Sequence, residues 1–415
     1  MTDVLIIGAG PAGAMAAAFL VRKGYKVLVL ERQRFPRFSI GESMLPASME
    51  FIEKAGMMEA VMAASFQYKD GAVFHLHDMR HEFKFPLKFS PGPGFTFEVP
   101  RDEFDKILID EAERQGAEVR YEVEITAVDV SGPTPVVTAR TLDGRVETHR
   151  PRFLLDASGF GRTLPRLLDL ELPSNFPVRG ALFTQVYDNI PSGAFDRQKI
   201  LVVIHPKRRD VWFWVIPFSN GRVSMGCVAN AEFHGQYSGT PEERLWKIVN
   251  EVDTLRDLLK HAKPANPVGE LRGYAANVKS LHGRGWALLG NAAEFLDPVF
   301  SSGVCIAMKS ADLAAEILDR QFKGQAVDWN QEFAAPLKIG VETFRGFVEH
   351  WYDGGLADIF FHPRKNEKIQ RMICSVLAGY GWDLNNPYVG VGKRRLTALV
   401  EACRGGADAE LAVAS

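Results

Sequence analysis

Val4-Leu-Ile-Ile-Gly-Ala-Gly-Pro-Ala-Gly13, near the start of the chain, is the stretch that decides the fold. Its first four residues form a short apolar run typical of a buried parallel strand, and a G-x-G-x-x-G pattern follows directly. The next residues predict a helix that ends at Gly24. A second apolar run, Val27–Leu30, then ends at Glu31. This is the βαβ fingerprint of a dinucleotide-binding domain.

Each fingerprint residue has a physical task. Gly8 allows the tight turn, Gly10 the close approach of a pyrophosphate, and Gly13 the packing of the helix on the strand. Glu31 would accept hydrogen bonds from the ribose hydroxyls of the adenosine. The residues that we assign to this site are these four together with Pro11, Ala12 and Arg32.

Length and composition exclude several classes of protein. A chain of 415 residues is too long for one ordinary core. The chain has 49 lysine and arginine residues and 51 aspartate and glutamate residues, which gives a formal net charge of -2. This near-neutral charge argues against a nucleic acid or an anionic membrane surface as partner. No apolar run approaches the roughly 18 residues of a membrane span, and no signal peptide is recognisable. Four scattered cysteines predict neither a metal site nor disulfides. We therefore expect a cytoplasmic protein.

Two later segments resemble parts of a known FAD fold. Phe153–Arg162 contains a D-x-S-G turn after an apolar run, and Trp286–Asp297 contains Gly-Asn-Ala after another. With the fingerprint, they resemble the flavoproteins built like p-hydroxybenzoate hydroxylase. The resemblance implies FAD as cofactor and adds four cofactor-binding residues, which are Arg101, Asp156, Gly290 and Asp297. Asn291 departs from the family, which has aspartate there.

Arg101 opens an amphipathic helix predicted over residues 100–116. An alternative to cofactor binding is that Arg101 only solvates the start of this helix. No second glycine fingerprint for a nicotinamide cofactor is present, which favours a flavin that a separate protein reduces.

The predicted fold class is α/β, a Rossmann-like FAD/NAD(P)-binding domain with an antiparallel β-sheet platform and a C-terminal helical segment. Alternating apolar and polar residues from about 176 to 275 indicate the platform. We place the FAD-binding domain at 1–75, 98–172 and 272–330, and the platform at 76–97 and 173–271. Aromatic-rich helices are expected over 331–404, with their aromatic side chains mainly in the core, and a disordered tail over 405–415.

Val211-Trp-Phe-Trp-Val-Ile-Pro-Phe218 belongs to this platform. Alternation along a strand sends Trp212, Trp214 and Ile216 to one face. Such a strand is often simply core. Its W-x-W-x-I-P pattern, however, resembles the signature of flavin-dependent halogenases. That resemblance implies a flavin-shielding wall of Trp212, Trp214, Ile216 and Pro217, which keeps the substrate away from the flavin hydroperoxide.

A second match to the halogenases involves a lysine. Phe38–Pro46 and Phe66–Phe74 resemble the G-E-S and F-x-x-K-x-G segments of the phenol- and pyrrole-directed branch, which makes Lys69 the catalytic residue. An ammonium group can hydrogen-bond hypohalous acid, and a neutral amine can carry the halogen as a haloamine. The alternative is an ordinary exposed surface lysine.

The third match is Phe295–Val304, where a helix is expected to begin at about Ser302. Free N–H groups at a helix start attract anions. The resemblance implies a halide site at Ser302 and Gly303, and flavin contacts at Gly303 and Val304. Phe300 stands where tryptophan halogenases carry glutamate. We therefore expect an electron-rich substrate such as a phenol, resorcinol or pyrrole.

Together these features predict an FADH2- and O2-dependent halogenase that uses chloride or bromide, acting through flavin hydroperoxide, hypohalous acid and Lys69. A separate flavin reductase would supply FADH2, and the small aromatic substrate would be free or tethered to a carrier protein. Two alternatives remain open: an FAD-dependent monooxygenase or oxidoreductase without halogenating activity, and a flavin-binding protein without turnover.

Overall fold

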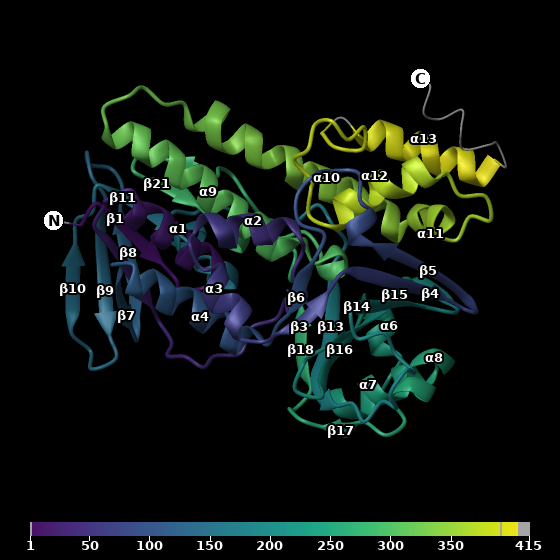
Figure 1. Ribbon diagram of the computed structural model, residues 1–415. Helices are drawn as coiled ribbons and strands as arrows, with labels where there is room; N and C mark the ends of the chain where they lie inside the picture. The colour runs from purple at the N-terminus through teal and green to yellow at the C-terminus, as the bar shows by residue number, and fades with distance from the viewer. Residues whose placement is uncertain (1, 391, 406–415) are drawn as a thin grey trace.

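The computed structural model describes residues 2–390 and 392–405 (Figure 1). Its first elements confirm the fingerprint, with β1 at Val4–Ile7, α1 at Pro11–Arg22 and β2 at Val27–Glu31. Residues 406–415 of the expected tail lie outside the described part, and Gly405 ends helix α13 (Gly392–Gly405).

The first sheet carries the fingerprint at its centre. β1 pairs in parallel with β2 on one side and β11 (Phe153–Asp156) on the other. The sheet is completed by β7 (Glu118–Tyr121), β21 (Trp286–Leu288) and the antiparallel β20 (His282–Gly283). The carboxyl ends of the parallel strands therefore meet at one edge, where α/β sheets bind their ligands.

Both faces of this sheet are covered, which explains its continuous apolar runs. Val4 and Ile6 pack into the core that contains helix α1, whereas Leu5 and Ile7 pack toward a small antiparallel sheet. Helices α4 (Arg101–Arg114) and α9 (Ser302–Phe322) flank α1. The small sheet consists of β8 (Val123–Asp129), β9 (Val136–Thr141) and β10 (Val146–His149).

The second sheet is the platform. Its order is β17 (Lys263–Pro264), β13 (Arg179–Tyr187), β16 (Arg222–Asn230), β15 (Arg208–Pro217), β14 (Lys199–His205), β4 (Gly71–Leu76) and β5 (Met79–Lys84), with β18 (Gly269–Arg272) also on β13. Neighbours are antiparallel, except that β4 and β14 are parallel. The sheet thus takes in residues before 76, where we placed its first segment.

Strand β15 alternates as the sequence predicts. Trp212, Trp214 and Ile216 join the large core that the platform shares with the first sheet. Its other face joins a separate core covered by α7 (Pro241–Asn250) and α8 (Asp253–Leu258), to which Val211, Phe213 and Val215 contribute. The two tryptophans therefore face the interior of the molecule.

The C-terminal helices form one group beside the platform, drawn in yellow-green and yellow in Figure 1. They are α10 (Ala335–Tyr352), α11 (Gly355–Phe360), α12 (Glu367–Leu377) and α13. As expected, most of their aromatic side chains are buried in the core, including Phe344, Phe347, Trp351 and Phe360. None of the helices in the described ranges is long and apolar enough to cross a membrane.

Candidate functional site

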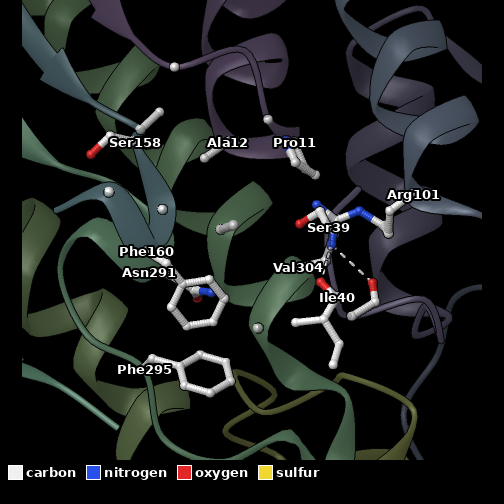
Figure 2. A pocket seen from close by; sticks show the side chains of 18 of the residues that line it. Pro11, Ala12, Ser39, Ile40, Arg101, Ser158, Phe160, Asn291, Phe295 and Val304 are labelled. Atoms are coloured by element: carbon white, nitrogen blue, oxygen red, sulfur yellow. Dashed lines mark hydrogen bonds between the residues drawn. The ribbon is translucent and has the colours of Figure 1, made fainter. Parts of the chain in front are cut away.

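A cavity of about 360 Å³ lies at the carboxyl edge of the first sheet and is bounded on its other side by the platform. Figure 2 shows that its side chains come from several distant segments of the chain. The sequence-predicted site residues that line it are Gly8, Gly10, Pro11, Ala12, Glu31, Arg32, Arg101, Trp212, Trp214, Ile216, Gly303 and Val304. Those that do not line it are Gly13, Lys69, Asp156, Pro217, Gly290, Asp297 and Ser302.

The glycines of the fingerprint divide into two kinds. A Cβ at Gly13 would lie 2.0 Å from the carbonyl oxygen of Gly8, and a Cβ at Gly8 would lie 2.7 Å from that of Ala157. These two glycines keep the loop packed on the sheet. A Cβ at Gly10 would instead face the cavity, with only the Arg37 guanidinium within 4 Å, at 3.5 Å. This open backbone beside a cation fits a pyrophosphate, as FAD binding requires.

Glu31 holds the glycine loop as well as lining the cavity. Its Oε2 accepts a hydrogen bond from the Ala9 amide at 2.8 Å, and its Oε1 accepts one from the Gln33 amide at 3.0 Å. Arg37, which the sequence did not single out, lies 3.8 Å from Oε2 and also lines the cavity. Carboxylate and guanidinium together match a ribose and its neighbouring phosphates.

Arg101 does more than solvate the start of α4. Its guanidinium is buried, forms a bidentate pair with Asp105 at 2.7 and 3.0 Å, and donates to the carbonyl oxygens of Ile40 and Gly41 at 2.8 and 3.0 Å (Figure 2). The bidentate pair fixes the plane of the guanidinium. Arg101 thereby fixes the loop around residues 38–43, which forms one side of the cavity.

Asp156 shapes the cavity from behind. Its carboxylate accepts hydrogen bonds from the Ser158 amide at 2.8 Å and the Leu164 amide at 2.6 Å. Burial raises the pKa of this carboxyl group. The turn that it anchors presents Ser158 and Phe160 to the cavity, and the Phe160 ring packs edge-to-face on Phe295 at a centroid distance of 5.2 Å (Figure 2).

The late segment also acts mainly through packing. A Cβ at Gly290 would lie 2.8 Å from the Cβ of Ala307, so this glycine lets its turn rest on α9. Asn291, which departs from the family pattern, lines the cavity with its side chain (Figure 2). At the start of α9, Ser301 has a left-handed backbone with φ of 55° and lines the cavity, whereas the Ser302 side chain is buried elsewhere.

The paired tryptophans form a fixed aromatic wall. Their ring centroids are 5.9 Å apart and the ring planes are inclined by 48°. The Trp214 Nε1–H donates to Ser224 Oγ at 3.1 Å, and the Trp212 Nε1–H donates to Tyr352 Oη at 3.0 Å. A buried indole usually needs such a partner. Both rings therefore hold one orientation toward the cavity.

Asp297 supports this wall without lining the cavity. Its Oδ2 accepts hydrogen bonds from Tyr352 at 2.8 Å and from Tyr274 at 3.1 Å. Arg179 lies over the Tyr352 ring at 3.4 Å. Burial raises the pKa of Asp297 to about 6. Tyr352 thus links the C-terminal helices to the wall, and no local sequence pattern marks it.

Lys69 is 1% exposed, so it is not an ordinary surface lysine. It ends β3 (Gln67–Lys69), and its Nζ donates to Ser43 Oγ at 2.5 Å and to the Met44 carbonyl at 2.8 Å. Burial lowers the pKa of its ammonium group. Ser43 itself lines the cavity, so one hydroxyl separates the lysine from the cavity that the two tryptophans also line.

Glu42 precedes Ser43 and also lines the cavity. It is buried, and its Oε1 accepts a hydrogen bond from Gln185 Nε2 at 2.6 Å. Burial raises the pKa of Glu42 to about 7. Both residues lie in the G-E-S segment, which carried the signal for them in the sequence, although neither received a role there.

Comparison with known proteins agrees with this geometry. The profile of the FAD binding domain family matches residues 1–332. The chain is 30% identical over 379 residues to a 1H-pyrrole-2-carbonyl-peptidyl-carrier-protein chlorinase of Pseudomonas fluorescens, and the match covers 85% of this chain and 82% of that one. The predicted FAD cofactor and α/β FAD-binding fold are confirmed.

Two solved structures extend over nearly the whole chain. A flavoprotein/dehydrogenase from Cytophaga hutchinsonii is 42% identical, with a TM-score of 0.94 and coverage of 98% of this chain and 99% of that one. A flavin-dependent brominase is 25% identical, with a TM-score of 0.83 and coverage of 98% and 99%.

Proposed function

Because this chain belongs to the flavin-dependent halogenase family of FAD oxidoreductases, we propose that it halogenates an electron-rich aromatic ring with chloride or bromide and that Lys69 directs the halogen. The observation that carries the proposal is the position of Lys69: its buried amine reaches, through Ser43, the cavity that Trp212 and Trp214 close. Bound FAD in its reduced form supplies the activation of O2 that oxidises halide to hypohalous acid.

The protein's own contribution is to separate oxidation from transfer. The aromatic wall occupies the platform side of the cavity, where a ring-shaped substrate would otherwise reach the cofactor. Hypohalous acid is small and passes where a ring cannot. Ser43 lines the cavity and Lys69 lies behind it, so the two offer the acid a hydroxyl and an amine as hydrogen-bonding groups.

For the halide we propose the start of α9, where Gly303 and Val304 border the cavity. The free amides of a helix start favour an anion. Since the Ser302 side chain is buried away from the cavity, its share in this site would be its backbone amide. Ser301, in its left-handed conformation, turns the chain just before this helix start and lines the cavity itself.

The substrate class that we propose is a phenol, resorcinol or pyrrole, free or tethered to a carrier protein, with FADH2 from a separate reductase. Phe300 has no carboxylate to offer to the reaction. Its ring packs against Phe347 and Trp351. A relative that acts on a carrier-bound pyrrole supports this class.

The test supplies FADH2, bromide or chloride, O2 and a panel of phenols and pyrroles, and measures mass shifts of the products. We expect halogenated product from the wild type and none from Lys69→Ala. Hydroxylated product alone from both proteins would refute halogenation.

One observation favours a second candidate, an FAD oxidoreductase or monooxygenase of the same fold without halogenating activity. The structure that is 42% identical to this chain is described as a flavoprotein/dehydrogenase. This candidate predicts NADPH oxidation by the purified protein without an added reductase and without dependence on halide.

A further inference from the structure

Glu98 is a buried carboxyl group that the proposed mechanism does not yet use. It ends β6 (Thr96–Glu98), has 0% exposure, and neither of its oxygens accepts a hydrogen bond from the described residues. Burial raises the pKa of Glu98 to about 7. A buried carboxyl group without hydrogen bonds destabilises a fold, so its presence needs an explanation.

The neighbour of this carboxyl group is the proposed catalytic amine. Lys69 Nζ lies 3.8 Å from Glu98 Oε1. The contact follows from strand pairing. Strands β3 and β6 are antiparallel with Lys69 opposite Thr96, and Glu98 lies two residues further along the same face of β6. Ser43 forms an isolated bridge with Glu98. Both side chains are almost fully removed from water, with exposures of 1% and 0%.

We propose that Glu98 is the proton-exchange partner of Lys69 during halogen transfer, an inference that rests on the proposed function. Phe300 stands where tryptophan halogenases carry glutamate, so that position supplies no carboxylate. The fold supplies one from strand β6, with Glu98 Oε1 3.8 Å from the amine. Burial disfavours the charged form of both groups, so it favours transfer of a proton from the ammonium to the carboxylate.

Halogen transfer then proceeds by two proton transfers between Lys69 and Glu98. Glu98 takes a proton from the Lys69 ammonium, which leaves a neutral amine beside a carboxylic acid. The amine attacks the halogen of hypohalous acid, so that the O–X bond breaks, an N–X bond forms, and the displaced hydroxide leaves as water with the amine's proton. The ring then attacks the halogen while Glu98 protonates the nitrogen. The ring proton then passes to the Lys69 amine, which releases the halogenated product and restores the ammonium–carboxylate pair.

The singly protonated pair is therefore the active form. Activity should fall at low pH, where the pair gains a second proton, and at high pH, where it loses its only one. The charged groups that face Glu98 are Lys69 from β3 and Glu42 from the loop before α2 (Ala47–Lys54). Ser43 faces both but does not titrate.

The experiment compares the full-length wild type, Glu98→Gln, Glu98→Asp and Asp70→Asn. The last is a matched control, because Asp70 pairs with a different lysine, Lys199, at 2.7 Å. Two quantities are measured with reduced FAD and bromide: hypobromous acid, captured by a thiol probe, and bromination of a phenol. The ratio of the two isolates the transfer step.

We expect Glu98→Gln to form hypobromous acid and bind FAD like the wild type. Its bromination of the phenol should be at least about 100-fold slower. Its bromination rate should also fall on only one side of the pH range, whereas that of the wild type falls on both. Glu98→Asp should recover part of the rate, and Asp70→Asn should match the wild type. Bromination by Glu98→Gln within about 3-fold of wild type, with both pH limbs retained, would overturn the inference.

A second measurement does not depend on halogenation. In the protein without FAD, NMR of isotopically labelled lysine follows the titration of the Lys69 amine. Glu98→Gln should lower its midpoint by at least one pH unit, because the carboxylate no longer stabilises the ammonium form. An unchanged midpoint would overturn the pairing. Absence of hypobromous acid in the wild type would instead refute the proposed function and leave the NMR result standing.

Discussion

The indole ring of Trp214 lies directly over Gly226 of the neighbouring strand, where a Cβ would come within 2.2 Å of the ring atom Cη2. The two residues are opposite each other in the pairing of β15 with β16. A glycine in the middle of a strand commonly marks such a close approach. Gly226 therefore fixes how far the Trp214 ring can settle onto the platform and how far it reaches into the cavity.

Substitution Gly226→Ala should displace the Trp214 ring toward the cavity. The overpacked methyl group should lower the free energy of unfolding by about 1–3 kcal/mol and weaken FAD binding, since Trp214 lines the same cavity. Equilibrium denaturation and flavin titration measure the two effects. Gly235→Ala is the control, because a Cβ there meets nothing within 4 Å. Equal FAD affinities for Gly226→Ala and wild type would contradict the assignment.

Tyr352→Phe should loosen the wall without removing any ring. The substitution leaves the Trp212 Nε1–H and one oxygen of Asp297 without the Tyr352 hydroxyl. Asp297 Oδ2 keeps its hydrogen bond from Tyr274, but the buried Trp212 Nε1–H is left without a partner, which costs about 1–3 kcal/mol. We expect a lower unfolding temperature and a red shift of tryptophan fluorescence as Trp212 gains access to water. Tyr187→Phe, at an exposed position of β13, should change neither.

The contrast between these two contacts shows what the sequence could predict. The sequence correctly predicts that Trp212 and Trp214 share one face of their strand, because a period of two is a local property of a strand. The hydrogen bond from Trp212 to Tyr352 spans 140 positions, and it depends on where α10 ends relative to the platform. No periodicity within either segment encodes that distance.

The same limit applies to the lysine. The G-E-S segment and Lys69 were recognisable from resemblance, yet the carboxylate beside the amine comes from the pairing of β3 with β6.

Likewise, Asp156, Gly290 and Asp297 were predicted as cofactor ligands from their motifs. In the structure, Asp156 anchors a turn, Gly290 lets its turn rest on α9, and Asp297 supports the aromatic wall. Neighbouring residues of these three parts line the cavity. A motif identifies the site but does not distinguish a ligand from its support.

Gly10→Ala and Gly13→Ala should separate binding from folding within one loop. The Cβ at position 10 would enter the cavity, so we expect a normal fold and an FAD dissociation constant raised at least about 10-fold, or roughly 1.4 kcal/mol. The Cβ at position 13 would lie 2.0 Å from the Gly8 oxygen, so that variant should lose thermal stability even without FAD. Calorimetry and flavin titration on both variants check this. An intact Gly13→Ala protein with normal stability would show that the loop relaxes.

Glu42 makes the stability of the FAD-free protein depend on pH in a direction opposite to that of an ordinary paired carboxylate. Burial raises its pKa to about 7 in the folded protein, against 4.5 for the free group. Between these values the folded state holds a proton that the unfolded state has released, so this group's contribution favours folding at low pH and declines as pH rises toward 7. The slope is at most about 1.4 kcal/mol per pH unit.

Glu42→Gln should remove this pH dependence, so that the mutant gains stability relative to the wild type as pH rises from 4.5 to 7. Chemical denaturation across this range measures the difference, and Glu53→Gln, at an exposed position of α2, serves as control. A mutant–wild-type difference that stays constant with pH would show that Glu42 is ionised in the folded protein.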